Sequence, residues 1–305
     1  MSIEPQAPVS PSASEASAER SLAARILSGL VSFARRSPLS AFWGVIAVAI
    51  VVMAVAAPVI TPYDPLKSDF RRMQKPPDEI NYFGSDQVGR DTLSRVIHGS
   101  RISLTVAVAA VLLGTTLGSL WGLASGYFGG RFDIFSQRII EFLQAFPDLI
   151  LAMAIAMALG SGTGTVIIAI AITRIPFGGR VIRSVVLSLK EMSFVEAARS
   201  LGASHWRIML RHILPQCIAP YLILATTHLG VAIIIEASLG FLGVGIPPPT
   251  PTWGNMLADA LNAGIVPPWW LVLFPGLAIT ITVLAFNLLG DGIRDILDPR
   301  LRGSV

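Results

Sequence analysis

The stretch EAARSLGASHWRIMLRHILP, residues 196–215, decides how this chain is organised. It is polar and basic, and long hydrophobic stretches lie on both sides of it. Ala197 and Ala198 allow another backbone to approach closely, and Gly202 can adopt the left-handed conformation that ends a helix. The stretch therefore predicts a short helix followed by a tight turn, a compact knob that fits a groove of another protein.

The residues around this knob predict where its helices begin. A helix that starts near Met192 or Ser193 places Glu196 in its first turns, where a carboxylate suits the positive end of the helix dipole and Ser193 can cap the helix. Pro215 is then expected to open the next helix, because proline is favoured in a first turn. An ordinary amphipathic surface helix is the alternative interpretation of the same residues.

The composition excludes an ordinary soluble domain. The chain has 305 residues, of which 53% are hydrophobic and 14% charged, and its mean hydropathy is +0.66. These values place it in a lipid bilayer. In a membrane protein the net charge of +4 informs on orientation rather than on nucleic-acid binding. The single cysteine, Cys217, excludes an internal disulfide and a cysteine-rich metal site.

Long uncharged runs predict six membrane spans. About twenty apolar residues cross the ~30 Å hydrocarbon layer as a helix. The run 149–173 is uncharged for 25 residues and allows one tilted span, but the helix breaker GSGTG at 160–164 favours two. The predicted spans are 41–60, 102–123, 140–159, 165–182, 216–235 and 269–289.

An even number of spans places both chain ends on one side of the membrane, and basic residues indicate which side. The segment 174–211 holds seven basic and two acidic residues and is expected to be cytoplasmic. The segment 237–268 has no basic residue and is expected to be external. The segment 61–101 contradicts this rule, because it must be external and carries seven basic residues.

Residues 196–215 resemble the loop that defines permease subunits of ABC importers. That pattern is EAA, three residues, Gly, nine residues, Ile, any residue and Leu-Pro. His212 stands where the pattern has Ile, and Ile213 follows it, which shifts one apolar contact by one residue. The matching residues are Glu196, Ala197, Ala198, Gly202, Leu214 and Pro215.

Nearly the whole chain beyond its N-terminal tail is similar to the second permease subunit of dipeptide, oligopeptide and nickel importers. The strings that carry this resemblance are FGSDQVGRDTLSRVIHGSRISL (83–104), GYFGGRFD (126–133), FVEAARSLGASHWRIMLRHILPQ (194–216), EASLGFLGVGIPPPTPTWGNML (236–257) and NLLGDGIRDILDPR (287–300). The resemblance implies an all-α integral membrane protein with six transmembrane helices. It also implies that the first span and an external segment precede a five-helix core.

The resemblance implies partners as well. A homologous second permease would complete a path for di- or oligopeptides, two ATP-binding subunits would dock on the cytoplasmic loop, and an external (periplasmic) binding protein would deliver the cargo. Nickel and glutathione remain alternative cargoes. The location implied is the bacterial inner membrane, in contact with lipid and with both chain ends cytoplasmic. The residues expected to couple the chain to the ATPases are Glu196, Ala197, Ala198, Gly202, Trp206, Leu214 and Pro215.

The predicted organisation has five parts. The tail 1–38 is cytoplasmic, and its Ser-, Ala- and Pro-rich start is expected to be disordered rather than a cleaved signal peptide. The remaining parts are the first span 39–61, the external segment 62–101, the core 102–290 with its cytoplasmic coupling loop 183–215, and the cytoplasmic tail 291–305.

No catalytic, metal or cofactor site is predicted. GSGTG lacks the Gly-Lys of a phosphate-binding loop, and the four histidines lack metalloprotease spacing, so ATP must be hydrolysed by another chain. His228 and Glu236 are candidates for a translocation path, although Glu236 suits an interfacial or structural role equally well. Gly114, Gly118 and Gly122 form a ridge that favours close helix packing.

Two other classes of protein remain as alternatives. A transporter driven by an ion gradient would be expected to carry buried charges or paired broken helices, and the predicted span centres are neutral apart from His228. A membrane-embedded enzyme would need a nucleophile with its base, or a metal site, at suitable spacing. Whether uptake stops with loss of ATP or with loss of the proton gradient separates the importer from the first alternative.

Overall fold

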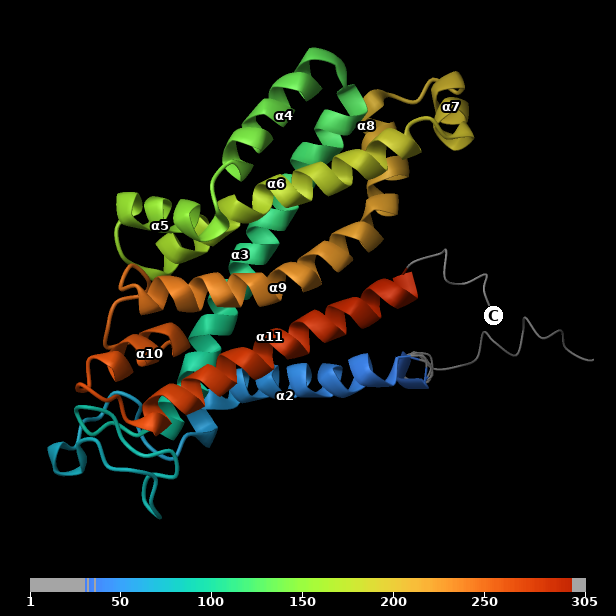
Figure 1. Cartoon of the computed structure of the whole chain (residues 1–305). Coiled ribbons are helices and arrows are strands. Elements are labelled where there is room, and N and C mark those ends of the chain that lie inside the picture. The colour runs from blue at the N-terminus through green and yellow to red at the C-terminus, as the bar shows by residue number, and fades with distance from the viewer. Residues whose placement is uncertain (1–30, 32, 36, 298–305) are drawn as a thin grey trace, which may run out of the picture.

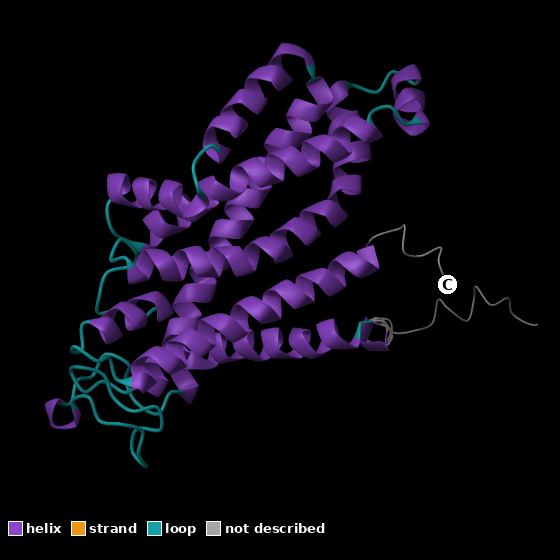
Figure 2. Cartoon of the chain, viewed as in Figure 1, coloured by secondary structure: helices purple, strands orange, loops and turns teal. Residues whose placement is uncertain are grey.

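A computed structural model describes residues 31, 33–35 and 37–297 of the chain. The disordered start predicted for the N-terminal tail and the end of the C-terminal tail lie outside these residues. The described part is helical and contains no strand (Figure 2). Its helices are α2 (Pro38–Ile60), α3 (Thr92–Phe128), α4 (Gly130–Gln144), α5 (Asp148–Leu159), α6 (Thr163–Leu189), α7 (Ser193–Ser200), α8 (His205–Arg207), α9 (Ile218–Phe241), α10 (Trp253–Leu261) and α11 (Trp269–Leu297).

Within the described residues, five helical stretches are long and apolar enough to cross a membrane, namely Pro38–Ile60, Thr92–Phe128, Thr163–Leu189, His205–Phe241 and Trp269–Ile296. A sixth crossing results if α4 and α5, which meet at an angle of 90°, form one broken span. The prediction of an all-helical membrane protein is confirmed, and its sixth span corresponds to the bent pair of α4 and α5 if these two helices cross as one.

The bend corrects the straight helix predicted over 140–159. Helix α4 ends at Gln144, and Pro147 precedes the first residue of α5. A proline disfavours helical conformation in the residue before it, which accounts for the interruption. The break predicted at GSGTG is confirmed, because α5 ends at Leu159 and α6 begins at Thr163.

Several helices are longer than the spans predicted for them, and two of them begin well before the predicted residue. Helix α3 begins ten residues before position 102, where the Asp91 side chain accepts a hydrogen bond from the backbone N–H of Ser94 at 2.8 Å. The helical stretch that contains α9 begins at His205, so the prediction that Pro215 opens it is wrong. Pro215 instead lies in a 3₁₀ turn, directly after a π-helical turn at Ile208–Ile213.

The centre of the fold is the contact between α3 and α6, the most extensive packing in the molecule. A Cβ atom added to Gly114, Gly118 or Gly122 would lie 2.2–2.3 Å from a backbone carbonyl oxygen of α6. Only glycine allows two helices to come this close. The ridge predicted from the glycine spacing is therefore confirmed.

The helices place two groups of loops at opposite ends of the molecule (Figure 1). The segment between α2 and α3 lies beside α10 at one end, whereas α7 lies at the other. Helix α2 begins and α11 ends on the side of α7.

The segment between α2 and α3 is anchored on the later helices. The Trp270 indole N–H donates to the carbonyl oxygen of Ser85 at 3.2 Å, and the rings of Phe83 and Phe274 are stacked with centroids 3.8 Å apart. The Gln87 side chain donates to the carbonyl oxygen of Asp259 at 2.6 Å.

Two of the seven basic residues that contradicted the orientation rule form ion pairs with buried or half-buried carboxylates. Arg90 pairs with Asp86 at 2.6 Å, and Arg95 lies 3.6 Å from Asp86 and 3.5 Å from Asp259. These guanidinium groups are compensated inside a folded segment.

Candidate functional site

The turn that ends α7 is a Schellman motif. The backbone N–H of Ala203 donates to the carbonyl oxygen of Ala198 at 3.0 Å, and that of Gly202 donates to Arg199 at 2.9 Å. Gly202 has a φ of +76°, in the left-handed region that side chains resist. The predicted turn at Gly202 is confirmed, and it fixes the direction in which the chain leaves α7.

The start of α7 differs from the prediction. Met192 occupies the N-cap position, and no side chain caps the helix. Ser193 is already the first helical residue, so its hydroxyl lies one position too late to act as the cap. Glu196 lies in the first turn as expected.

The inner face of α7 is held by apolar packing. Val195 is fully buried and Ala198 is 8% exposed. Both belong to a cluster that joins the ends of α3 and α6 to the π-helical turn, and its other buried members are Leu123, Tyr127, Ile182, Val186, Ile208, Met209, Ile213 and Cys217. The knob is therefore part of the bundle, not a loose loop.

The outer face of the knob exposes large apolar side chains. Leu201 is 87% exposed and Trp206 is 62% exposed, and Glu196 and Ala197 are also exposed. The Trp206 ring meets that of Phe128, at the end of α3, edge to face at a centroid distance of 6.2 Å. Apolar groups of this size at the end of a membrane bundle are typical of a surface that another protein covers.

The last predicted residues of the loop lie at its base. Leu214 is half-buried against the same cluster, and Pro215 is exposed. Ile213 is fully buried, whereas His212 is only partly buried and its Nδ1 lies 3.3 Å from the carbonyl oxygen of Arg207. The apolar contact is therefore displaced by one residue, as the departure at position 212 predicts.

The two predicted path residues lie inside this subunit. His228 is 6% exposed, and its Nδ1 lies 3.3 Å from the Thr115 hydroxyl. Glu236 is 2% exposed, and its Oε2 atom has no hydrogen-bond partner among the described residues. Glu236 is thus buried within the subunit. Their role in a path stays a prediction, which requires the helices to separate.

Sequence reasoning missed a charged pair near the middle of α6. Arg174, 3% exposed at its side chain, pairs with Asp148 at the start of α5. Its guanidinium carbon also lies 5.0 Å from the ring centroid of Phe177, and that ring meets His228. The neutrality expected of the span centres apart from His228 therefore does not hold at Arg174, which lies in the middle of the predicted span 165–182. Asp148 is the first residue of α5, directly after Pro147 at the bend.

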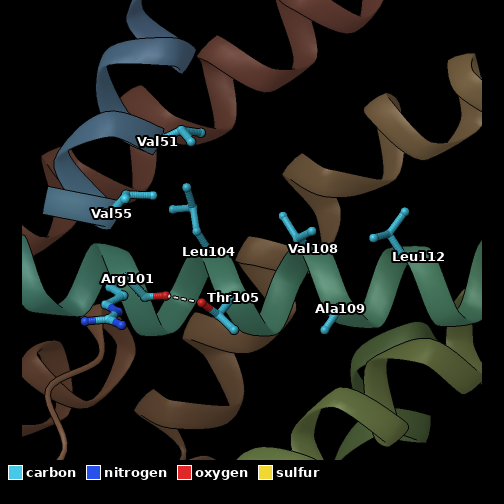
Figure 3. A pocket seen from close by; sticks show the side chains of 9 residues that line it. Val51, Val55, Arg101, Leu104, Thr105, Val108, Ala109 and Leu112 are labelled. Carbon is cyan, nitrogen blue, oxygen red and sulfur yellow. Dashed lines mark hydrogen bonds between the residues drawn. The ribbon is translucent and has the colours of Figure 1, made fainter. Parts of the chain in front are cut away.

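A groove of about 490 Å³ runs between α2 and α3. Figure 3 shows Leu104, Val108 and Leu112 on the side of α3 that faces Val51 and Val55. The Thr105 hydroxyl is used by the backbone, since it donates to the carbonyl oxygen of Arg101 at 2.6 Å. Such an apolar lining suits contact with hydrocarbon rather than recognition of a polar cargo.

The bundle, its bent span and its exposed knob define a subunit of a membrane transport system. Residues 114–303 match the family of binding-protein-dependent transport system inner membrane components, and residues 34–77 match the N-terminal transmembrane domain of oligopeptide transport permease C. The chain belongs to this family and is a multi-pass permease subunit of an ABC importer.

Curated relatives are similar in sequence to this chain along most of their length. A putative peptide transport system permease of Brucella suis is 43% identical over 253 residues, covering 83% of this chain and 85% of the relative. A glutathione transport system permease of Pectobacterium atrosepticum is 40% identical, covering 88% and 93%. A probable D,D-dipeptide transport system permease of Escherichia coli is 39% identical, covering 90% and 92%.

A solved structure has the same fold. The methionine ABC transporter MetNI, in an inward-facing conformation, contains a chain that superposes with a TM-score of 0.52 at 18% identity. The match covers 68% of this chain and 97% of that chain.

Proposed function

We propose that this chain forms half of a path through which an ATP-driven importer of the bacterial inner membrane moves short peptides. The relatives named for peptide, D,D-dipeptide and glutathione transport support this cargo, because glutathione is itself a tripeptide. Nickel remains the alternative cargo. A homologous second permease would supply the other half of the path, and an external binding protein would deliver the peptide.

The exposed knob carries the proposal. Leu201 and Trp206 project at the end of the bundle, in a segment whose inner face is fixed to α3 and α6. An ATP-binding subunit with an apolar groove would cover them, and Glu196 and Ala197 would lie in the same contact. Binding of ATP would close two such subunits, displace the two knobs and tilt the helices attached to them. ATP acts in this scheme only through its different affinity for the two states.

The chain alone is expected to be inactive. The purified subunit in liposomes should neither hydrolyse ATP nor take up a labelled peptide. The complex with a second permease, two ATPases and the binding protein should do both. Peptide uptake by the isolated subunit in the absence of ATP would contradict the importer and support an ion-gradient transporter.

A second prediction concerns orientation. We propose that α7 and both chain ends are cytoplasmic, with the segment between α2 and α3 and helix α10 external. Asn262→Cys should then react in intact cells with a thiol reagent that cannot cross the membrane, whereas Ser204→Cys should react only after the cells are opened. The native Cys217 is buried and contributes little background. Labelling of Ser204→Cys in intact cells would contradict the proposed orientation.

A further inference from the structure

Helix α4 is held to α6 by a charged pair that lies outside the coupling loop. Its sequence motif, GYFGGRFD, ends in Asp133, which lies in the first turn of α4. Arg183 of α6 donates from Nε to Oδ1 of Asp133 and from Nη2 to Oδ2, both at 2.5 Å. Such two-point contacts fix the relative orientation of the two groups as well as their distance.

The same carboxylate reaches a third helix. The Ser125 hydroxyl of α3 donates to Oδ1 of Asp133 at 2.5 Å, and the Gln137 side chain of α4 lies 3.4 Å from that hydroxyl. The side chains of Asp133 and Arg183 are 14% and 27% exposed. Asp133 therefore joins α3, α4 and α6 at the end of the bundle that carries the knob.

The backbone changes direction at both ends of α4. At its start, Gly129 and Gly130 have φ values of +65° and +57°. The backbone is therefore not a continuous helix from α3 into α4. At its end the chain turns by 90° into α5. Within α4, only Ser136 and Ile140 are buried. Side-chain contacts thus determine how α4 lies on α6.

Helix α6 is the element that leads into the knob. It ends at Leu189, and α7 begins at Ser193. Backbone bonds from Lys190 to Val186 and from Met192 to Leu189, at 2.9 and 3.1 Å, leave little slack between the two helices. When α7 is displaced, it should therefore move the end of α6 that carries Arg183.

We propose that Asp133 and Arg183 are positioning residues that make α4 move together with α6 when the coupling loop is displaced. This role rests on the function proposed above. The pair between Arg174 and Asp148 holds the far side of the bend to the same helix. The interruption at residues 145–147 then absorbs any difference in tilt between α4 and α5.

The test measures peptide uptake and ATP hydrolysis in the same liposomes, with the complete complex. Asp133→Asn keeps the shape of the side chain and removes its charge. The number of peptides moved per ATP should fall at least fivefold while hydrolysis continues. Exchanging the charges, with Asp133→Arg and Arg183→Asp together, should restore the ratio to within twofold of the unmodified complex.

The chain offers a matched control on the same helix. Arg138 pairs with Glu141 at 2.8 Å, but both residues belong to α4 and the pair is exposed. Arg138→Gln should leave the ratio unchanged. An unchanged ratio in Asp133→Asn would overturn the proposal. So would a parallel loss of uptake and hydrolysis that the charge exchange fails to repair, because that result indicates a purely structural role.

A second measurement does not depend on transport. Spin labels at Ile134→Cys on α4 and Ser184→Cys on α6, both exposed positions, report the distance between the helices in a Cys217→Ala background. The distance distribution should be narrow in the parent and in Arg138→Gln, and broad in Asp133→Asn. An equally narrow distribution in Asp133→Asn would overturn the proposed positioning role of Asp133 and Arg183, even if ATP-driven uptake is never observed. Absence of uptake by the unmodified complex would instead contradict the proposed function.

Discussion

Gly118→Ala should strongly destabilise the folded subunit, although it adds a single methyl group. The new Cβ atom would lie 2.2 Å from the carbonyl oxygen of Ile175 and 3.0 Å from that residue's backbone carbon. Neither atom can rotate away, so α3 and α6 must separate along their whole contact. Overpacking of a core costs ~1–3 kcal/mol and more where backbone is involved, and we expect a loss of about 3 kcal/mol or more. The melting temperature in detergent and the yield of monodisperse protein measure this loss.

The control is the same substitution in an open place. Gly276 lies within α11, and an added Cβ would meet no atom within 4 Å. Gly276→Ala should be neutral or stabilise by up to ~1 kcal/mol, because alanine is the better helix former. Equal melting temperatures for Gly118→Ala and the unmodified protein would mean that the two helices are further apart than described.

Gly202→Val should abolish ATP-driven uptake while the subunit is still made and inserted. A left-handed conformation costs a side-chain-bearing residue ~1–2 kcal/mol, and a β-branched side chain is among the least tolerant. Nothing lies within 4 Å of an added Cβ, so the damage is confined to the turn. Because α7 buries only Val195 and Ala198, a strain of this size is enough to unfold its end. Uptake should fall at least tenfold at unchanged membrane abundance.

Gly202→Asn is the matched variant, since asparagine adopts the left-handed conformation more readily. It should retain uptake within about twofold if strain is the cause. Gly202→Asp tolerates the conformation almost as well but adds a charge to the contact, and we expect it to fail with the ATPases present. Normal uptake by both Gly202→Val and Gly202→Asp would show that the turn is not part of the coupling contact.

Features that depend on regular spacing or on helix-breaking residues could be predicted from the sequence. The glycines of the ridge at 114, 118 and 122 repeat at about one helical turn, so they lie on one face of the helix whatever the rest of the chain does. Gly202 and the breaker at 160–164 act through backbone conformation, which neighbouring residues determine. For these features, short-range physics is sufficient.

Features that depend on distant residues were missed. The bend at Pro147 lies in a long apolar run, and a hydropathy window averages over it. Arg174 and Asp148 are 26 positions apart, so their pairing is visible only once α5 and α6 are placed. The same holds for the ion pairs of Arg90 and Arg95 with Asp259, at 3.6 and 3.5 Å.

The order in which the spans are synthesised has a consequence for α2. This helix packs mainly against α11 and α3, and roughly 200 residues of chain separate the end of α2 from the start of α11. At ~5–20 residues per second, a ribosome needs on the order of 10–40 s to make that length. During this interval the face of α2 that carries Ala47, Ile50 and Ala54 waits for its last neighbour among lipid chains. Lipid chains are as apolar as these side chains, so the waiting face loses close helix packing but no hydrophobic stabilisation during the delay.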